Sequence, residues 1–324
     1  MKMLYAMVGM AMMAMACGSG NNATTTNTEN NTAQTTTQTM TFSADSAYAY
    51  VKQQCDMGPR VPGTPAHEQC AQWLTAQLGR WCDTVIVQQA PVTTFDGTTL
   101  TCKNIVGTFN PDATDRILLL AHWDCRPWAD NDPDPALHTQ PVMGANDAAS
   151  GTAVILELAR LMADKRPEVG VDLLLVDVED WGQNEDEDSW ALGTQHWANN
   201  PHVAGYKANF GILLDMVGTR GARFSHEYFS LQYAQGVVGM VWEAAKKAGY
   251  GSYFVNQQGG AITDDHVMVN RIAGIPTIDI IDMRPDSETG FFDGWHTTHD
   301  TLDQIDPATL KAVGQTLANL IANW

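Results

Sequence analysis

Short apolar runs in this chain end repeatedly in side chains that can bind a metal ion, and no other feature constrains its fold as strongly. These side chains lie in five segments, which are His122-Trp-Asp124, Gly144-Ala-Asn-Asp147, Glu179-Asp180, Leu213-Leu-Asp215 and Trp295-His296. Strand ends that meet at one edge of a parallel sheet build a single site there. The recurrence therefore predicts an enzyme whose site is assembled from distant parts of the chain.

Four apolar runs show little alternation, as expected of strands buried on both faces of a parallel sheet. They cover residues 117–121, 171–178, 212–214 and 277–281. Helical periodicity follows or separates them, and helices are predicted over residues 152–162, over 231–248 and from Asp306-Pro307 to Trp324. Shorter helices are predicted over residues 46–54 and 67–78, and shorter strands over 85–89 and 104–108. The alternation predicts an α/β three-layer sandwich with a central, mostly parallel sheet.

The overall charge limits the class of partner. The chain carries 37 acidic and 18 basic residues, a formal net charge of −19. Nucleic-acid-binding proteins instead concentrate lysine and arginine against the phosphate backbone. No nucleic-acid partner is therefore expected.

The first residues are typical of export. An apolar run over residues 3–16 is too short to span a bilayer but has the length of a signal-peptide core. Ala14-Met-Ala16 leads directly into Cys17, which resembles a bacterial lipoprotein signal. We therefore expect a signal peptide over residues 1–16, a lipid anchor at Cys17 and a position on the periplasmic side of the bacterial cell envelope. Ordinary secretion with an incidental Cys17 is the alternative.

Composition divides the remainder into a tether and a body. Residues 17–41 are rich in Asn, Thr and Gln and are predicted to form a disordered tether, because they offer little apolar surface to bury. Residues 42–324 are predicted to form a single catalytic α/β domain. The cysteines of this domain fit no zinc-finger spacing and leave disulfide pairing open. They are Cys55, Cys70, Cys82, Cys102 and Cys125.

The acidic and imidazole side chains at the predicted strand ends suit zinc. A catalytic zinc ion takes three protein ligands from His, Asp or Glu and keeps one position open. Asp147, Asp180 and His296 supply such a set. In an extended chain Glu179 points to the opposite side from Asp180, so one can bind the metal while the other serves as acid or base.

Aromatic residues beside the predicted ligands indicate a substrate pocket. Phe291 and Trp295 precede His296, and Trp190 follows an acidic loop, so these three aromatics are expected to line or close the pocket. The acidic loop, residues 183–189, is similar to a fragment of an EF-hand. It lacks the central glycine and the terminal glutamate of that motif, and we expect a solvated surface loop rather than a calcium site.

The order of these motifs resembles the zinc-dependent aminopeptidase clan, in which His-x-Asp is followed by Asp, an acidic pair, Asp and His. Within that clan, Asp264-Asp-His266 and the position of Trp295 before His296 are similar to the glutaminyl cyclase branch, in particular its bacterial lipoprotein-like members. The resemblance runs from Ala44 to Trp324. It implies a zinc exopeptidase-like fold for this chain.

The resemblance also implies an activity. A glutaminyl-peptide cyclotransferase converts the N-terminal glutamine of peptides and proteins to pyroglutamate and releases ammonia. One zinc ion would bind Asp147, Asp180 and His296, and Glu179 would act as general base and acid. The animal members usually carry Glu-Glu at the acidic pair, whereas the second member here is the shorter Asp180. The metal site is therefore expected to survive with altered geometry.

The same resemblance implies roles for two further residues, Asp215 and Asp264. Two other hypotheses about the function of the chain remain. Asp215 and Asp264 would form a hydrogen-bonded acid network beside Glu179. In a two-zinc aminopeptidase of the same clan, His122 and Asp215 would instead bind a second metal, with Asp147 bridging both. A non-catalytic lipoprotein that binds peptides or glycans is the third hypothesis, and it gives no reason for a ligand set combined with Glu179.

Overall fold

The computed structural model describes residues 40–324. The predicted signal peptide, Cys17 and the predicted tether up to residue 39 lie outside the described residues. Met40 and Phe42 are both buried in the main core, so the chain already packs against the domain at the first described residue. Between residues 40 and 324 no helix has the length and apolar character needed to cross a membrane.

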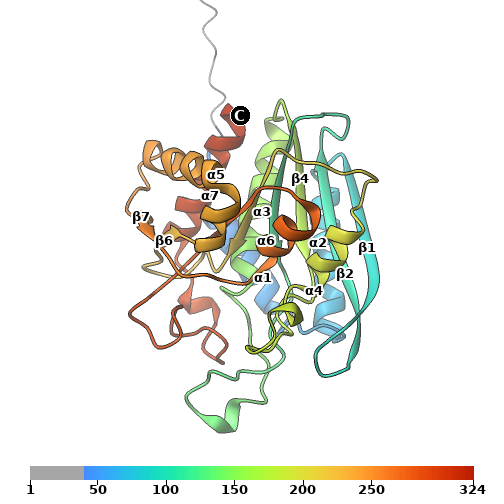
Figure 1. Ribbon diagram of the computed structural model, residues 1–324, viewed down its shortest axis with the longest axis vertical. Helices are drawn as coiled ribbons and strands as arrows, with labels where there is room; N and C mark the ends of the chain where they lie inside the picture. Colours follow the sequence, from blue (N-terminus) through green and yellow to red (C-terminus); the bar gives the residue numbers. More distant parts are fainter. Residues whose placement is uncertain (1–39) are drawn as a thin grey trace, which may run out of the picture. The chain divides into compact units, whose positions relative to one another are not determined.

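A six-stranded sheet forms the centre of the domain (Figure 1). Its strand order is β1-β2-β4-β3-β5-β8, with antiparallel pairing at β1–β2 and β2–β4 and parallel pairing from β4 through β3 and β5 to β8. The strands are β1 (Thr84–Thr93), β2 (Thr99–Phe109), β3 (Arg116–His122), β4 (Gly170–Val176), β5 (Phe210–Asp215) and β8 (Thr277–Ile281). Every residue of the four parallel strands is buried, which explains their continuous apolar runs.

Helices cover both faces of this sheet. They are α1 (Ala44–Asp56), α2 (Pro65–Gly79), α3 (Ala149–Asp164), α4 (Leu192–Asn199), α5 (Tyr228–Lys247), α6 (Asp265–Met268) and α7 (Pro307–Asn323). Alternate residues of β3 face different layers: Leu119 and Ala121 belong to the larger core, which includes side chains of α1, α2, α3, α5 and α7, whereas Leu118 and Leu120 join a smaller core with Trp197 of α4. This arrangement confirms the predicted three-layer α/β sandwich.

A small second sheet was not predicted. Strands β6 (Phe224–His226) and β7 (Phe254–Gln258) pair in parallel, and α5 connects them. In Figure 1 this unit lies on the side of the molecule opposite the β1–β2 hairpin. Three residues are too few to show strand periodicity, so β6 leaves no signal in the sequence.

Helix ends follow their capping residues. Asp306 caps α7 by accepting a hydrogen bond from the Ala308 backbone N–H, and Pro307 occupies the first turn, as predicted. The five cysteines named above are all free thiols in the structure.

Candidate active site

The carboxyl ends of the parallel strands place the predicted site residues at one edge of the sheet. His122 ends β3, Asp215 ends β5, and Glu179 and Asp180 lie in the segment that follows β4. Asp147 lies just before α3, whose first turn packs near these strand ends. The fold therefore brings together side chains that are far apart in the chain.

A pocket of about 260 Å³ lies at this edge. All the residues predicted to bind metal, act in catalysis or bind substrate line it, and they are Asp147, Glu179, Asp180, Trp190, Asp215, Asp264, Phe291, Trp295 and His296. Asn184 and Glu187 also line it, although we predicted their loop to be a solvated surface segment.

The predicted ligand set forms a compact group. One ligand atom from each of Asp147, Asp180 and His296 lies within 4.8 Å of the others, and all three residues are buried. The His296 Nε2 atom lies 3.2 Å from Asp180 Oδ1 and 3.7 Å from Asp147 Oδ2. Asp180 Oδ2 is buried without a hydrogen-bond partner among the described residues, which calls for a bound group. Two carboxylates and an imidazole fit a zinc ion.

A second group shares Asp147 with the first. His122 Nε2 lies 2.9 Å from Asp147 Oδ1 and 3.3 Å from Asp215 Oδ1, and the three residues form another metal-competent set. Burial lowers the pKa of His122, but hydrogen bonds to Asp124, Asp147 and Asp215 outweigh it and raise that pKa well above the ordinary value. The neighbouring carboxylates thus favour the protonated form of this imidazole.

Glu179 has the surroundings of an acid–base residue. Burial raises its pKa well above the ordinary value, and the nearby carboxylates of Asp264 and Asp180 add to the rise, against a lowering by His122. Burial and the charge of Asp215 raise the pKa of Asp264 to about 7. Catalytic acids and bases work best with pKa values near the operating pH. Glu179 and Asp264 are therefore placed to hold and pass protons.

Glu179 and Asp180 both line the pocket, although neighbours in a regular strand would point to opposite sides. Strand β4 ends at Val176 instead of continuing to Val178, and Val178 has a left-handed backbone with φ of 54°. A β-branched residue rarely adopts this conformation, so the turn is strained. Met216 and His296 have similar positive φ values of 48° and 55°. Strained backbone thus adjoins or carries several site residues.

The predicted acid network also differs in its connections. No hydrogen bond joins Asp215 to Asp264 within residues 40–324. Asp215 is bonded to His122, and Asp264 caps α6 by accepting a hydrogen bond from the Asp265 backbone N–H. The two carboxylates interact through charge alone, which contributes to the raised pKa of Asp264.

Two carboxylates hold the loops that carry the site residues. Asp124 accepts hydrogen bonds from the backbone N–H groups of Glu179 and Asp180, at 3.1 and 3.2 Å. Asp300 accepts them from Asn146 and Asp147, at 2.8 and 3.0 Å. Neither aspartate was assigned a role from the sequence. The spacing of His122-Trp-Asp124 was the available signal for the first.

Arg126 is another residue without a sequence signal. Its Nη1 atom lies 3.2 Å from Asp180 Oδ1, and its guanidinium also makes two hydrogen bonds to Asp130, at 2.7 and 2.6 Å. The guanidinium lies between the rings of Trp128 and Trp190, 5.2 and 5.1 Å from their centroids. Arg126 therefore fixes the orientation of a predicted ligand and of a pocket-lining ring together.

Two aromatic rings lie close to the His296 imidazole. The Trp295 ring is stacked on it with centroids 3.9 Å apart, and the Trp190 ring is nearly parallel to it at 6.1 Å. Phe291 contacts Trp295 at 4.6 Å. The predicted substrate-binding aromatics therefore form one wall of the pocket, with the metal-binding group beside it.

Comparisons with known proteins agree with this geometry. The model of peptidase family M28 matches residues 104–321. A crystal structure of Tannerella forsythia glutaminyl cyclase is 51% identical, covers 88% of this chain and 99% of its own, and superposes with a TM-score of 0.86. A structure described as a leucine aminopeptidase precursor from Bacteroides thetaiotaomicron is 48% identical, with 89% and 99% coverage and a TM-score of 0.86. Bovine glutaminyl-peptide cyclotransferase is 24% identical over 301 residues, covering 82% of this chain and 78% of the relative.

Proposed function

This chain belongs to peptidase family M28, and on that premise we propose that it is a zinc-dependent glutaminyl-peptide cyclotransferase. Its substrates would be peptides and proteins that begin with glutamine, and its products pyroglutamyl peptides and ammonia. The observation that carries this proposal is a single pocket of about 260 Å³ in which Glu179, Asp264 and the Asp147–Asp180–His296 group meet. A glutaminyl cyclase that is 51% identical to this chain and covers 88% of it supports the same reaction.

The pocket residues divide the chemistry between them. A zinc ion held by Asp147, Asp180 and His296 would supply a Lewis acid that polarises the γ-carboxamide carbonyl. Glu179 accepts a proton from the α-amine, whose nitrogen forms the new bond to the γ-carboxamide carbon. The bond from that carbon to the amide nitrogen breaks, and Glu179 returns the proton so that ammonia leaves. Asp264 holds the departing nitrogen.

The pocket also favours an intramolecular attack. Its volume suits one side chain, because sites for drug-sized ligands span roughly 300–1,000 Å³. The wall formed by Trp295 and Phe291 would hold a glutamine side chain bent, with its amine close to its own carboxamide. Holding the reacting groups together in this way strongly increases the rate of the cyclisation.

Release of ammonia from a short peptide that begins with glutamine tests the proposal directly. We expect the product to lose the mass of one ammonia while the peptide bond stays intact. A leucine-amide substrate serves as the matched control and should remain uncleaved. Cleavage of the leucine amide without cyclisation of the glutamine peptide would refute the cyclotransferase and support a peptidase.

A two-zinc aminopeptidase is the second candidate function. The His122–Asp147–Asp215 group favours it, because a second ion there would share Asp147 with the first. Metal analysis separates the candidates. We propose one tightly held zinc ion per chain, whereas two would favour the aminopeptidase.

We further propose that the enzyme is lipid-anchored at Cys17 in the bacterial cell envelope and faces the periplasm. The support is the sequence before Cys17, which lies outside the described residues. Metabolic labelling with a clickable fatty acid, followed by a Cys17→Ser control, tests this. Equal labelling of both proteins would exclude the anchor.

A further inference from the structure

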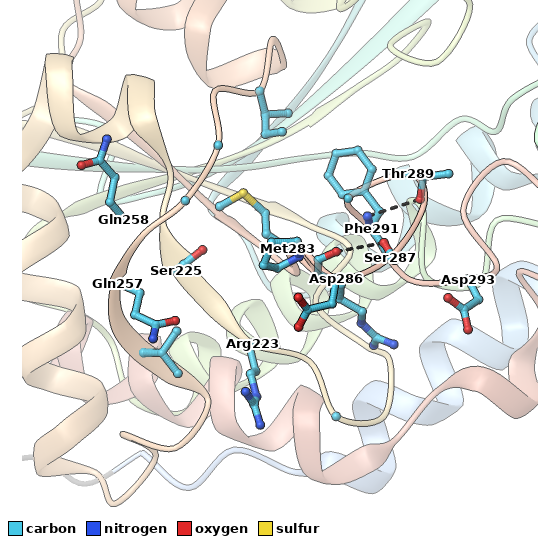
Figure 2. Close-up of a pocket in the computed structure, with 18 of the residues that line it drawn as sticks. Arg223, Ser225, Gln257, Gln258, Met283, Asp286, Ser287, Thr289, Phe291 and Asp293 are labelled. Atoms are coloured by element: carbon cyan, nitrogen blue, oxygen red, sulfur yellow. Dashed lines mark hydrogen bonds between the residues drawn. The ribbon is translucent and has the colours of Figure 1, made fainter.

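A larger cavity adjoins the catalytic pocket. Its volume is about 880 Å³, and Ile262 and Phe291 line both hollows. Figure 2 shows this cavity, with the small sheet contributing Ser225, Gln257 and Gln258 to its lining. The two hollows are therefore direct neighbours, with Ile262 and Phe291 at the border between them.

The lining changes character along the cavity. Met283, Ile262 and Phe291 make the part next to the catalytic pocket apolar, and they belong to one packed cluster. In Figure 2 Arg223 lies away from Phe291, and Gln257 and Asp286 are drawn closer to Arg223 than Ser225 is. An apolar lining with a few polar groups is typical of ligand-binding cavities.

Arg223 differs from the other two arginines of the cavity. Arg284 is paired with Asp282 at 2.8 Å and also bonds to Thr219, and Arg220 lies 3.9 Å from Asp306. No described residue accepts a hydrogen bond from the Arg223 guanidinium. Its backbone is nevertheless fixed, since its N–H donates to Asp282 Oδ1 at 2.9 Å. The Arg223 guanidinium is therefore a cation without an acidic partner among the described residues, on a segment whose backbone is held by Asp282.

We propose that this cavity binds the residues that follow the N-terminal glutamine of the substrate, and that Arg223 recognises an acidic side chain among them. The inference rests on the proposed cyclotransferase function. Cyclisation consumes only the first residue, and the small catalytic pocket has room for one side chain. The rest of the substrate has to lie outside that pocket, and the larger cavity is the hollow next to it.

Two acidic residues oppose this recognition and make it testable. Asp286 and Asp293 also line the cavity, on the loop that leads to His296. If they dominate, peptides with lysine after the glutamine would be preferred over peptides with glutamate. That preference would overturn the assignment of Arg223.

The test measures kcat/KM for cyclisation of pentapeptides that begin with glutamine and carry one glutamate at position two, three or four. Each is compared with the same peptides carrying glutamine or lysine instead of that glutamate. We expect the wild-type enzyme to prefer glutamate at one position by about two- to fivefold, the range of an exposed ion pair, and to lose the preference at high salt. Arg223→Ala should abolish the preference, and Arg223→Glu should reverse it towards lysine. Arg80→Glu, the same charge change outside the cavity, should leave it intact.

A second variant tests the cavity without changing charge. This variant is Gly260→Trp, because Gly260 also lines the cavity and a Cβ atom placed on it meets no heavy atom within 4 Å. We expect this variant to lower kcat/KM for the pentapeptides and to preserve it for a glutaminyl-glycine amide. Equal kcat/KM for every peptide in wild type and all variants would overturn the inference while the cyclotransferase stands. No cyclisation of any glutamine peptide, short or long, would refute the proposed function itself and the inference with it.

Discussion

Glu179 is the residue on which the proposed reaction depends most. It lies in the pocket beside the ligand group but outside it, so its removal should spare the metal. We expect Glu179→Gln to keep its zinc and to lose about 10²- to 10⁴-fold in kcat, the usual contribution of a general acid–base group. Ammonia release and metal analysis on the same sample measure both effects.

Glu187 offers a matched control for this substitution, because it is another glutamate that lines the pocket. Glu187→Gln should retain most of the activity, since Glu187 is exposed and has no role in the proposed proton transfer. A near-normal rate in Glu179→Gln would remove Glu179 from the mechanism.

His296 provides a second prediction at the residue scale. Its Nε2 atom faces both Asp147 and Asp180, so His296→Ala leaves two carboxylates facing each other without an imidazole. We expect this variant to be purified without zinc, because two protein ligands hold the ion far more weakly than three. His299 lies in the same loop but outside the ligand group, so His299→Ala should retain its full zinc content. Normal zinc content in His296→Ala would contradict the ligand assignment.

At the scale of the element, the loop before α3 depends on one carboxylate. Both oxygens of Asp300 accept backbone N–H groups, from Asn146 and from the predicted ligand Asp147. An asparagine side chain has only one oxygen, so its NH₂ group would face one of these N–H donors and one hydrogen bond would be lost. We expect Asp300→Asn to fold with unchanged helix content and to bind zinc about 10- to 100-fold more weakly, as for other groups that orient metal ligands.

Competition with a chelator of known affinity measures this loss. Asp303→Asn is the control, because Asp303 is exposed and bonds only to neighbouring side chains. Wild-type zinc affinity in Asp300→Asn would show that the loop keeps its shape with only one of the two hydrogen bonds.

The sequence predicts some elements well and others poorly. The strands β3, β5 and β8 and the helices α3, α5 and α7 were predicted because burial on both sheet faces or on one helix face leaves a clear pattern. Helix α4, residues Leu192–Asn199, is short and starts after the left-handed Ala191, without a side-chain cap. Helix α6, residues Asp265–Met268, spans a single turn. Such elements are set by tertiary packing and carry no periodic signal.

The same contrast holds for the site. Nine of the residues that line its pocket were predicted from the sequence, because strand ends and motif order point to them. The residues that orient them, Asp124, Asp300 and Arg126, were assigned no role. Their partners are backbone groups and a carboxylate at long sequence separation, as in the hydrogen bond from Asn146 to Asp300, and only the folded chain brings these together. The turn at Val178, which sends Glu179 and Asp180 into one pocket, was hidden for the same reason.

At the scale of the whole molecule, buried acids make stability depend on pH in an unusual direction. The pKa of Asp264 is raised to about 7 from 3.8, chiefly by burial. The folded state therefore holds a proton that the unfolded state releases. The stabilisation is fully present at low pH and is lost as pH rises from about 4 to about 7, at about 1.4 kcal/mol per pH unit for this group.

Thermal unfolding of the metal-free enzyme checks whether stability falls as pH rises. Asp264→Asn keeps a side chain able to cap α6 but removes the titration. Its Tm should therefore fall less between pH 5 and pH 7.5 (chosen to bracket about pH 7, the raised value) than the Tm of the wild type. Parallel Tm curves for the two proteins would show that Asp264 does not take up a proton on folding.

The order of the residues around the pocket has a consequence for how the enzyme matures. Asp147, Asp180 and His296 come from segments that follow different strands, and β8 separates the first two from the third in the chain. No contiguous fragment that stops before His296 can assemble the ion-binding group. Contacts at such long sequence separation form late and slowly. Zinc capture would therefore be a terminal event in biogenesis, and the metal content of a preparation would report the fraction of molecules that has completed the sheet.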